Sequence, residues 1–180
     1  SLLYTPQRIQ QVKQRMQHEP KLQEAWGDIK KTVDEALQKK DFNRLDYLSL
    51  AYLMTDNKGY ADAIKEILLK VVEAESWGDV EMMARIPAWR SQLGMAHKSF
   101  LSAVGYDAAY NVMSSSERKK IAEGLKRLAV EPALGDWLLE PTRIHSLNSM
   151  GHNWWTSCVC QGGILALSLQ NELPEVKEWV

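Results

Sequence analysis

The residues best suited to chemistry lie close together in the second half of the chain, between residues 143 and 155. This segment supplies a guanidinium group, two imidazoles, an amide and two indole rings, from Arg143, His145, His152, Asn153, Trp154 and Trp155. Flat aromatic rings cover the faces of sugar rings, and short polar groups bind hydroxyls and carboxylates. The mixture therefore predicts a carbohydrate site.

Each of these side chains also has a structural interpretation. Asn153 is a favoured helix N-cap, because its side chain accepts a hydrogen bond from a backbone amide of the first turn. The tryptophan pair can pack the entry of a helix into the core. Arg143 either binds a substrate carboxylate through two hydrogen bonds or ties down its own loop. Trp89 and Arg90 form a second candidate platform for a sugar, near Pro87.

Composition limits the possible partners. The chain has 180 residues, of which 45% are apolar and 25% are charged, as is typical of a folded globular domain. With 22 basic and 23 acidic residues the net charge is −1, which gives no global reason to expect nucleic acid or an anionic membrane. No apolar run reaches the roughly 18 residues that a membrane span requires.

Cys158 and Cys160 lie two residues apart on a predicted helix. Side chains at this spacing point to nearly opposite sides, so a disulfide between them is excluded and we expect two buried free thiols. No histidine and cysteine spacing demands a metal, and no cofactor is expected.

Apolar residues recur at helical spacing along most of the chain, and no useful stretch alternates with period two. The sequence predicts an all-α fold in one domain, residues 1–180, built from about four antiparallel helical pairs. The helices are expected near residues 6–16, 20–37, 45–54, 60–75, 89–112, 115–130 and from 153 onward. Gly162 and Gly163 would interrupt the last helix at a cost of about 1 kcal/mol each, so we expect a close contact there.

The expected connection from residue 135 to 151 lacks periodicity. Long irregular loops are uncommon in compact domains and are usually functional. This loop leads directly into the His152–Trp155 motif, which strengthens the prediction of a site there.

Three segments together resemble the heparinase II/III-like polysaccharide lyases, which include alginate-lyase-like enzymes. Residues 48–69 resemble a recurrent helical hairpin of α/α-toroid carbohydrate enzymes, and residues 103–118 are similar to the next hairpin, with its Tyr-Asp and Ser-x-x-Glu-Arg elements. The His-Asn-Trp-Trp motif at 152–155, followed by Gly-Gly-x-x-Ala-Leu, looks like the Asn-Trp helix of these lyases. The likeness covers roughly residues 45–170.

The resemblance implies an incomplete α/α toroid, the N-terminal part of a longer enzyme that cleaves an acidic polysaccharide or oligosaccharide by β-elimination. It implies a periplasmic or secreted location, with the catalytic tyrosine in the remaining C-terminal part. Asn153 would neutralise the uronate carboxylate, and His152 would bind that carboxylate or assist proton transfer. The expected substrate contacts are Trp155, Arg143, His145, Trp89, Arg90 and Tyr106.

Two other function classes stay open. A hydrolase for unsaturated uronides on the same scaffold would need catalytic carboxylates, for which Asp107 and Asp136 are the candidates. A non-catalytic helical module could also bind a glycan or a protein. Elimination creates a carbon–carbon double bond, hydrolysis adds water, and the binding module predicts no turnover.

Overall fold

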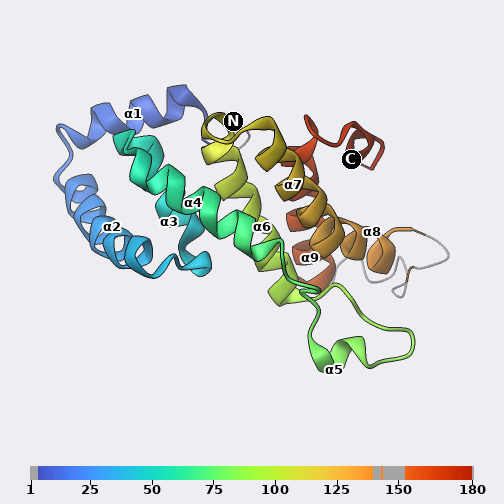
Figure 1. Cartoon of the computed structure of the whole chain (residues 1–180). Helices are drawn as coiled ribbons and strands as arrows, with labels where there is room; N and C mark the ends of the chain where they lie inside the picture. The colour runs from blue at the N-terminus through green and yellow to red at the C-terminus, as the bar shows by residue number, and fades with distance from the viewer. Residues whose placement is uncertain (1–3, 140–142, 144–152, 180) are drawn as a thin grey trace.

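The computed structural model describes residues 4–139, 143 and 153–179, and all regular elements in these ranges are helical (Figure 1). The all-α prediction is confirmed for this part of the chain. Its α-helices are α1 Pro6–Met16, α2 Pro20–Lys39, α3 Leu45–Thr55, α4 Lys58–Val71, α5 Val80–Met83, α6 Leu93–Ala109, α7 Ser115–Leu125, α8 Glu131–Trp137 and α9 Asn153–Leu169. No helix in the described ranges is both long and apolar enough to cross a membrane.

Several helices begin where local side-chain chemistry predicts. The Thr5 hydroxyl accepts a hydrogen bond from the Arg8 amide at the start of α1, and Pro6 occupies the first turn. At α7 the Ser114 hydroxyl accepts from the Glu117 amide while the Glu117 carboxylate accepts from the Ser114 amide. This reciprocal capping box satisfies two amides that the helix itself leaves unpaired.

Helix α6 is the centre of the packing. It lies between α3 and α9 and also contacts α4, while α8 packs against α9 (Figure 1). Gly105 permits the close approach of α6, because a Cβ atom there would lie 3.3 Å from both Leu45 and Ile64 side-chain atoms. Leu45 and Ile64 are fully buried, so the contact belongs to the main core.

The predicted helix from residue 89 begins later, at Leu93, with Gln92 as its N-cap. Residues 89–92 precede the helix because the Arg90 and Ser91 amides donate to the Asp136 carboxylate, far along the chain. The preceding segment carries the short helix α5 and projects from the helical body (Figure 1).

The expected loop from residue 135 also starts later, because α8 continues to Trp137. A π-helical turn, Lys126–Val130, joins α7 to α8. Pro132 follows this turn in the first turn of α8, where its missing N–H is tolerated. The chain therefore stays helical through Pro132, which lies beyond the expected helix end near residue 130.

The two glycines of α9 differ in environment. A Cβ atom on Gly162 would lie 3.0 Å from the Ala133 Cβ, so the expected close contact with another helix is present there. At Gly163 the same atom would meet nothing within 4 Å, so the prediction of close packing is wrong for this residue. The cysteine prediction needs a similar correction, because Cys158 is buried but Cys160 is exposed.

Candidate functional site

Indole rings from three parts of the chain gather at the start of α9. The Trp89 and Trp154 rings meet edge to face, with centroids 6.3 Å apart and an interplanar angle of 74°. Trp154 and Trp155 also pack against a small buried cluster that includes Trp137 and Cys158. We call Trp89, Trp137, Trp154 and Trp155 the indole cluster. The structure thus brings the predicted platform at residue 89 to the predicted motif at residue 153.

Asp136 fixes the segment that carries Trp89. Its carboxylate is fully buried and accepts hydrogen bonds from the Arg90 amide at 2.6 Å and the Ser91 amide at 2.7 Å. Its other oxygen accepts from the Arg90 guanidinium, at 2.8 Å from both Nε and Nη2. The Trp137 indole N–H donates to the Ser91 hydroxyl at 3.1 Å. Residues 89–91 are therefore attached to α8, and Arg90 contributes to this attachment instead of projecting freely toward a ligand.

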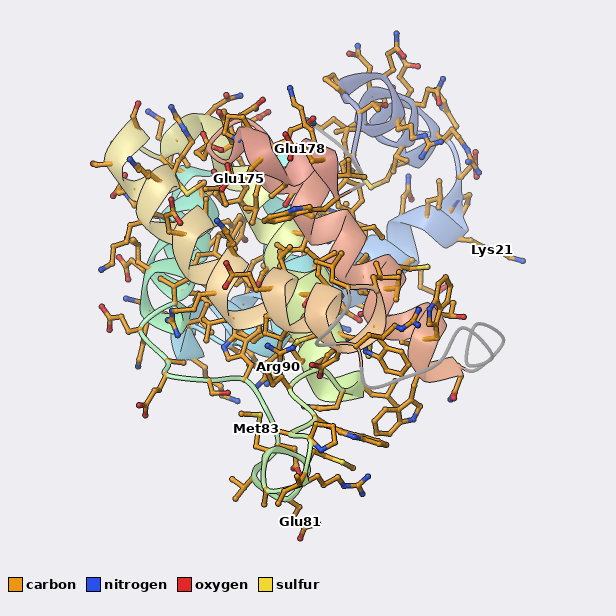
Figure 2. All side chains as sticks on the ribbon, turned by 90° about the vertical axis from the view of Figure 1, so that its right-hand side faces the viewer. Lys21, Glu81, Met83, Arg90, Glu175 and Glu178 are labelled. Atoms are coloured by element: carbon orange, nitrogen blue, oxygen red, sulfur yellow. The ribbon has the colours of Figure 1, made fainter. Side chains whose placement is uncertain are left out.

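Arg85 is a member of this region that the sequence analysis missed. Its guanidinium carbon lies over the Trp89 ring, 4.3 Å from the centroid. Figure 2 shows Glu81 at the outer end of the projecting segment, Met83 closer to the helical body and Arg90 at its base. The only sequence signal was an arginine four residues before a tryptophan, a spacing that carries no structural meaning outside a helix.

Asn153 is the first residue of α9, and its side chain is exposed. No amide in the described part of the chain donates a hydrogen bond to this side chain, so the structure does not support its interpretation as an N-cap. The first turn of a helix offers unpaired N–H groups and the positive end of the helix dipole, which favour an anion. Asn153 is thus an exposed residue that directly precedes Trp154 of the indole cluster in the chain.

Two predicted residues, His145 and His152, lie outside the described residues. Arg143 is half-buried, and its backbone amide donates to the Leu139 carbonyl at 2.8 Å. This backbone bond joins Arg143 to Leu139, two residues beyond α8. It leaves the role of the guanidinium as a prediction.

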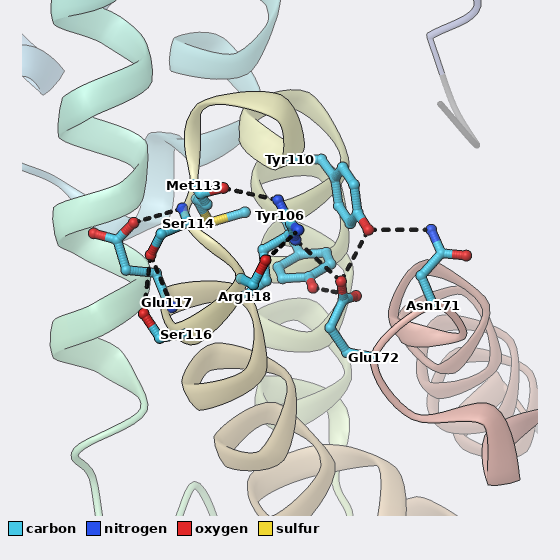
Figure 3. Close-up of polar contacts among 10 residues, drawn as sticks. Tyr106, Tyr110, Met113, Ser114, Ser116, Glu117, Arg118, Asn171 and Glu172 are labelled. Carbon is cyan, nitrogen blue, oxygen red and sulfur yellow. Dashed lines mark hydrogen bonds and ion pairs between the residues drawn. The ribbon is translucent and has the colours of Figure 1, made fainter.

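Tyr106 does not lie at the indole cluster. It is fully buried in a polar network near the other end of α6, where its hydroxyl donates to Glu172 at 2.5 Å (Figure 3). The same carboxylate accepts from the Tyr110 hydroxyl at 2.9 Å and from Arg118 at 3.1 Å. Burial, and then the hydrogen bond to Glu172, raises the pKa of Tyr106 far above its ordinary value. Tyr106 is therefore corrected from a substrate contact to a structural residue.

A second concave region of the structure lies away from the indole cluster. A space of about 650 Å³ lies between α1 and the C-terminal ends of α6 and α9, and its wall includes Lys13, Asp107 and Asn171. The indole cluster lies at the opposite, N-terminal end of α9. We place the candidate site at the cluster, since the hollow lacks the combination of indoles and arginines. Among the described residues, no three histidine, cysteine or acidic side chains gather as a metal site.

Comparison with known protein families and with curated protein sequences finds no match to this chain. The geometry at the start of α9 is therefore the basis for a functional proposal.

Proposed function

We propose that this protein is a polysaccharide lyase that cleaves a uronic-acid-containing polysaccharide by β-elimination. The observation that carries the proposal is the exposed Asn153 at the N-terminal end of α9, next in the chain to Trp154 and Trp155 of the indole cluster. This arrangement offers a hydrogen-bond donor for a carboxylate next to aromatic surface for a sugar ring.

The reaction explains why an amide is needed. The C5 proton of a uronate is not acidic while the adjacent carboxylate carries its full charge. Hydrogen bonding from Asn153, aided by the first-turn amides of α9, would stabilise the additional charge that develops as the proton leaves. A base removes the C5 proton, its electron pair forms the C4–C5 double bond, and the C4–O4 bond breaks. The departing oxygen then takes a proton from an acid.

The proton-transfer groups are assigned from the resemblance. His152 is adjacent to Asn153 in sequence and is proposed as a carboxylate ligand or proton-transfer group. Because Tyr106 is buried and committed to Glu172, we propose that the catalytic tyrosine comes from another part of the same polypeptide. The same resemblance suggests a periplasmic or secreted location.

The packing order is consistent with a toroid. Helices α3, α6 and α9 are successive neighbours, and α4 and α8 pack against members of this series. An arc of inner helices covered by outer helices would give these contacts. We propose that the helices form such an arc, with the ends of the inner helices lining the substrate cleft.

The hydrolase alternative receives less support. Asp136 is buried and its oxygens accept hydrogen bonds from Arg90 and Ser91, so it does not face a substrate. Asp107 lines the hollow at the opposite end of α9. The two aspartates therefore do not form the carboxylate pair that hydrolysis of a glycosidic bond requires.

The proposal is tested with the full-length polypeptide and a panel of uronic-acid polysaccharides, with a neutral dextran as the control. Ultraviolet absorbance follows the new double bond, and an assay of reducing ends follows chain cleavage by any mechanism. The lyase proposal predicts that both signals rise together on at least one uronate polymer. Reducing ends without absorbance would establish hydrolysis instead, and binding without either signal would indicate a non-catalytic module.

A further inference from the structure

We infer that Arg85, lying over the Trp89 ring, is a binding site for the carboxylate or sulfate groups of an acidic polysaccharide. The substrate class in this inference rests on the proposed function, whereas the anion site itself rests on the geometry of the projecting segment.

The Arg85 guanidinium is ordered by its contact with an aromatic face. Its central carbon lies 4.3 Å from the Trp89 ring centroid, a distance typical of a cation–π contact. A guanidinium held over a ring by a cation–π contact keeps its N–H donors for other partners. These donors match the two oxygens of a carboxylate or sulfate, so the contact prepares the group for an anion without using its hydrogen-bonding capacity.

The ring beneath Arg85 is held in place by further contacts. Trp89 meets Trp154 of α9 edge to face, and the next residue, Arg90, is bonded to the buried Asp136. The position of Arg85 is therefore coupled to α8 and to the first turn of α9.

Arg85 differs in its partners from Arg90 and Arg118. The Arg90 guanidinium is paired with Asp136, and that of Arg118 is paired with Glu172. Arg85 is exposed, and no carboxylate within the described ranges lies at ion-pair distance from it. An exposed guanidinium that lies over an aromatic ring and has no internal anion is suited to an external one.

The alternative is that Arg85 only shields Trp89 from water. Binding experiments distinguish the two roles, because shielding needs the side chain's bulk and an anion site needs its charge and N–H donors. The full-length polypeptide is titrated with polygalacturonate, which carries carboxylates, and with dextran sulfate, which carries sulfates. Neutral dextran is the control polymer. The variants are Arg85→Ala, Arg85→Lys and Arg85→Gln, and Arg8→Ala removes an exposed arginine of α1 as the matched control.

We expect Arg85→Ala and Arg85→Gln to weaken binding of at least one polyanion about three- to tenfold and to reduce its salt dependence. Arg85→Lys should weaken it less, because the charge remains. Loss on polygalacturonate alone identifies carboxylate as the ligand group, and loss on dextran sulfate alone identifies sulfate. The inference is overturned if Arg85→Ala binds both polyanions within twofold of the wild type, or if Arg8→Ala loses as much affinity.

The outcomes also separate this inference from the proposed function. Double-bond formation by the wild type, with unchanged polyanion binding by Arg85→Ala, would refute the Arg85 site and leave the lyase proposal standing. Weaker binding by Arg85→Ala in a protein that forms no double bond would support the anion site and contradict the lyase. The melting temperatures of the variants and the wild type are compared as well. Equal values show that a change in affinity does not come from loss of the fold.

Discussion

Replacement of Asp136 by asparagine tests whether a single buried carboxylate positions the Trp89 segment. The carboxylate accepts hydrogen bonds from the amides of Arg90 and Ser91 and from the Arg90 side chain. In Asp136→Asn the amide oxygen can still accept from both backbone groups, but the new NH₂ group faces the Arg90 guanidinium. Two donors then oppose each other, and the Arg90 side chain must turn toward water.

The expected cost follows from these contacts. Hydrogen bonds to a charged group contribute about 1.5–3 kcal/mol each, and the partly exposed guanidinium regains some of this by hydration. We therefore expect Asp136→Asn to lower the free energy of unfolding by about 2–3 kcal/mol, and Asp136→Ala by about 3–5 kcal/mol. For a chain of this size the asparagine variant should melt about 5–10 °C lower.

Urea unfolding followed by circular dichroism measures this change, and limited trypsin digestion reports local opening through cleavage after Arg85 and Arg90. The control is Asp62→Asn, since Asp62 is 62% exposed and lies 3.8 Å from Lys65. Such a surface pair contributes at most about 1 kcal/mol. Unfolding of Asp136→Asn within about 0.5 kcal/mol of the wild type, with no faster cleavage, would refute the positioning role.

Two further predictions concern stability. Gly162→Ala should destabilise the protein by about 1–3 kcal/mol because the added Cβ would crowd Ala133. Gly163→Ala should stabilise it by about 0.4–1 kcal/mol, because alanine has the higher helix propensity and its Cβ would meet open space. Equal melting temperatures of the two variants would contradict the assigned packing. The raised pKa of Tyr106 means that the folded state keeps the phenol protonated while the unfolded state begins to lose its proton near the ordinary value of 10.0. Stability should therefore be complete below about pH 10 and fall above it, and Tyr106→Phe should flatten this fall. An unchanged slope in pH-dependent urea unfolding would exclude Tyr106 as its source.

The sequence predicted those features that depend on neighbouring residues. The caps at Thr5 and Ser114 act over three residues, so their residue types were sufficient to place the starts of α1 and α7. The start of α6 was misplaced because the Arg90 and Ser91 amides bond to Asp136 across more than 40 residues. A pattern of helical spacing carries no information about such a distant partner.

The candidate site was predictable only where it depends on residues that are neighbours in the sequence. The motif that begins α9 was visible as a local combination of polar and aromatic residues, and Trp89 was identified as a separate platform. Their contact depends on tertiary packing, as does the position of Arg85 over Trp89. The difference between Gly162 and Gly163 likewise depends on where Ala133 lies, which helical periodicity alone does not specify.

The most direct test of the central claim is the rate of double-bond formation by Asn153→Ala in the full-length polypeptide, on the uronate polymer that the wild type cleaves. The Asn153 side chain is exposed, so we expect unchanged helicity and unfolding. Loss of one donor that stabilises developing charge should lower the turnover rate about 10²- to 10³-fold. Asn111→Ala, an exposed asparagine between α6 and α7, serves as the control and should retain the wild-type rate. A rate for Asn153→Ala within twofold of the wild type would contradict the proposed carboxylate neutralisation at the start of α9.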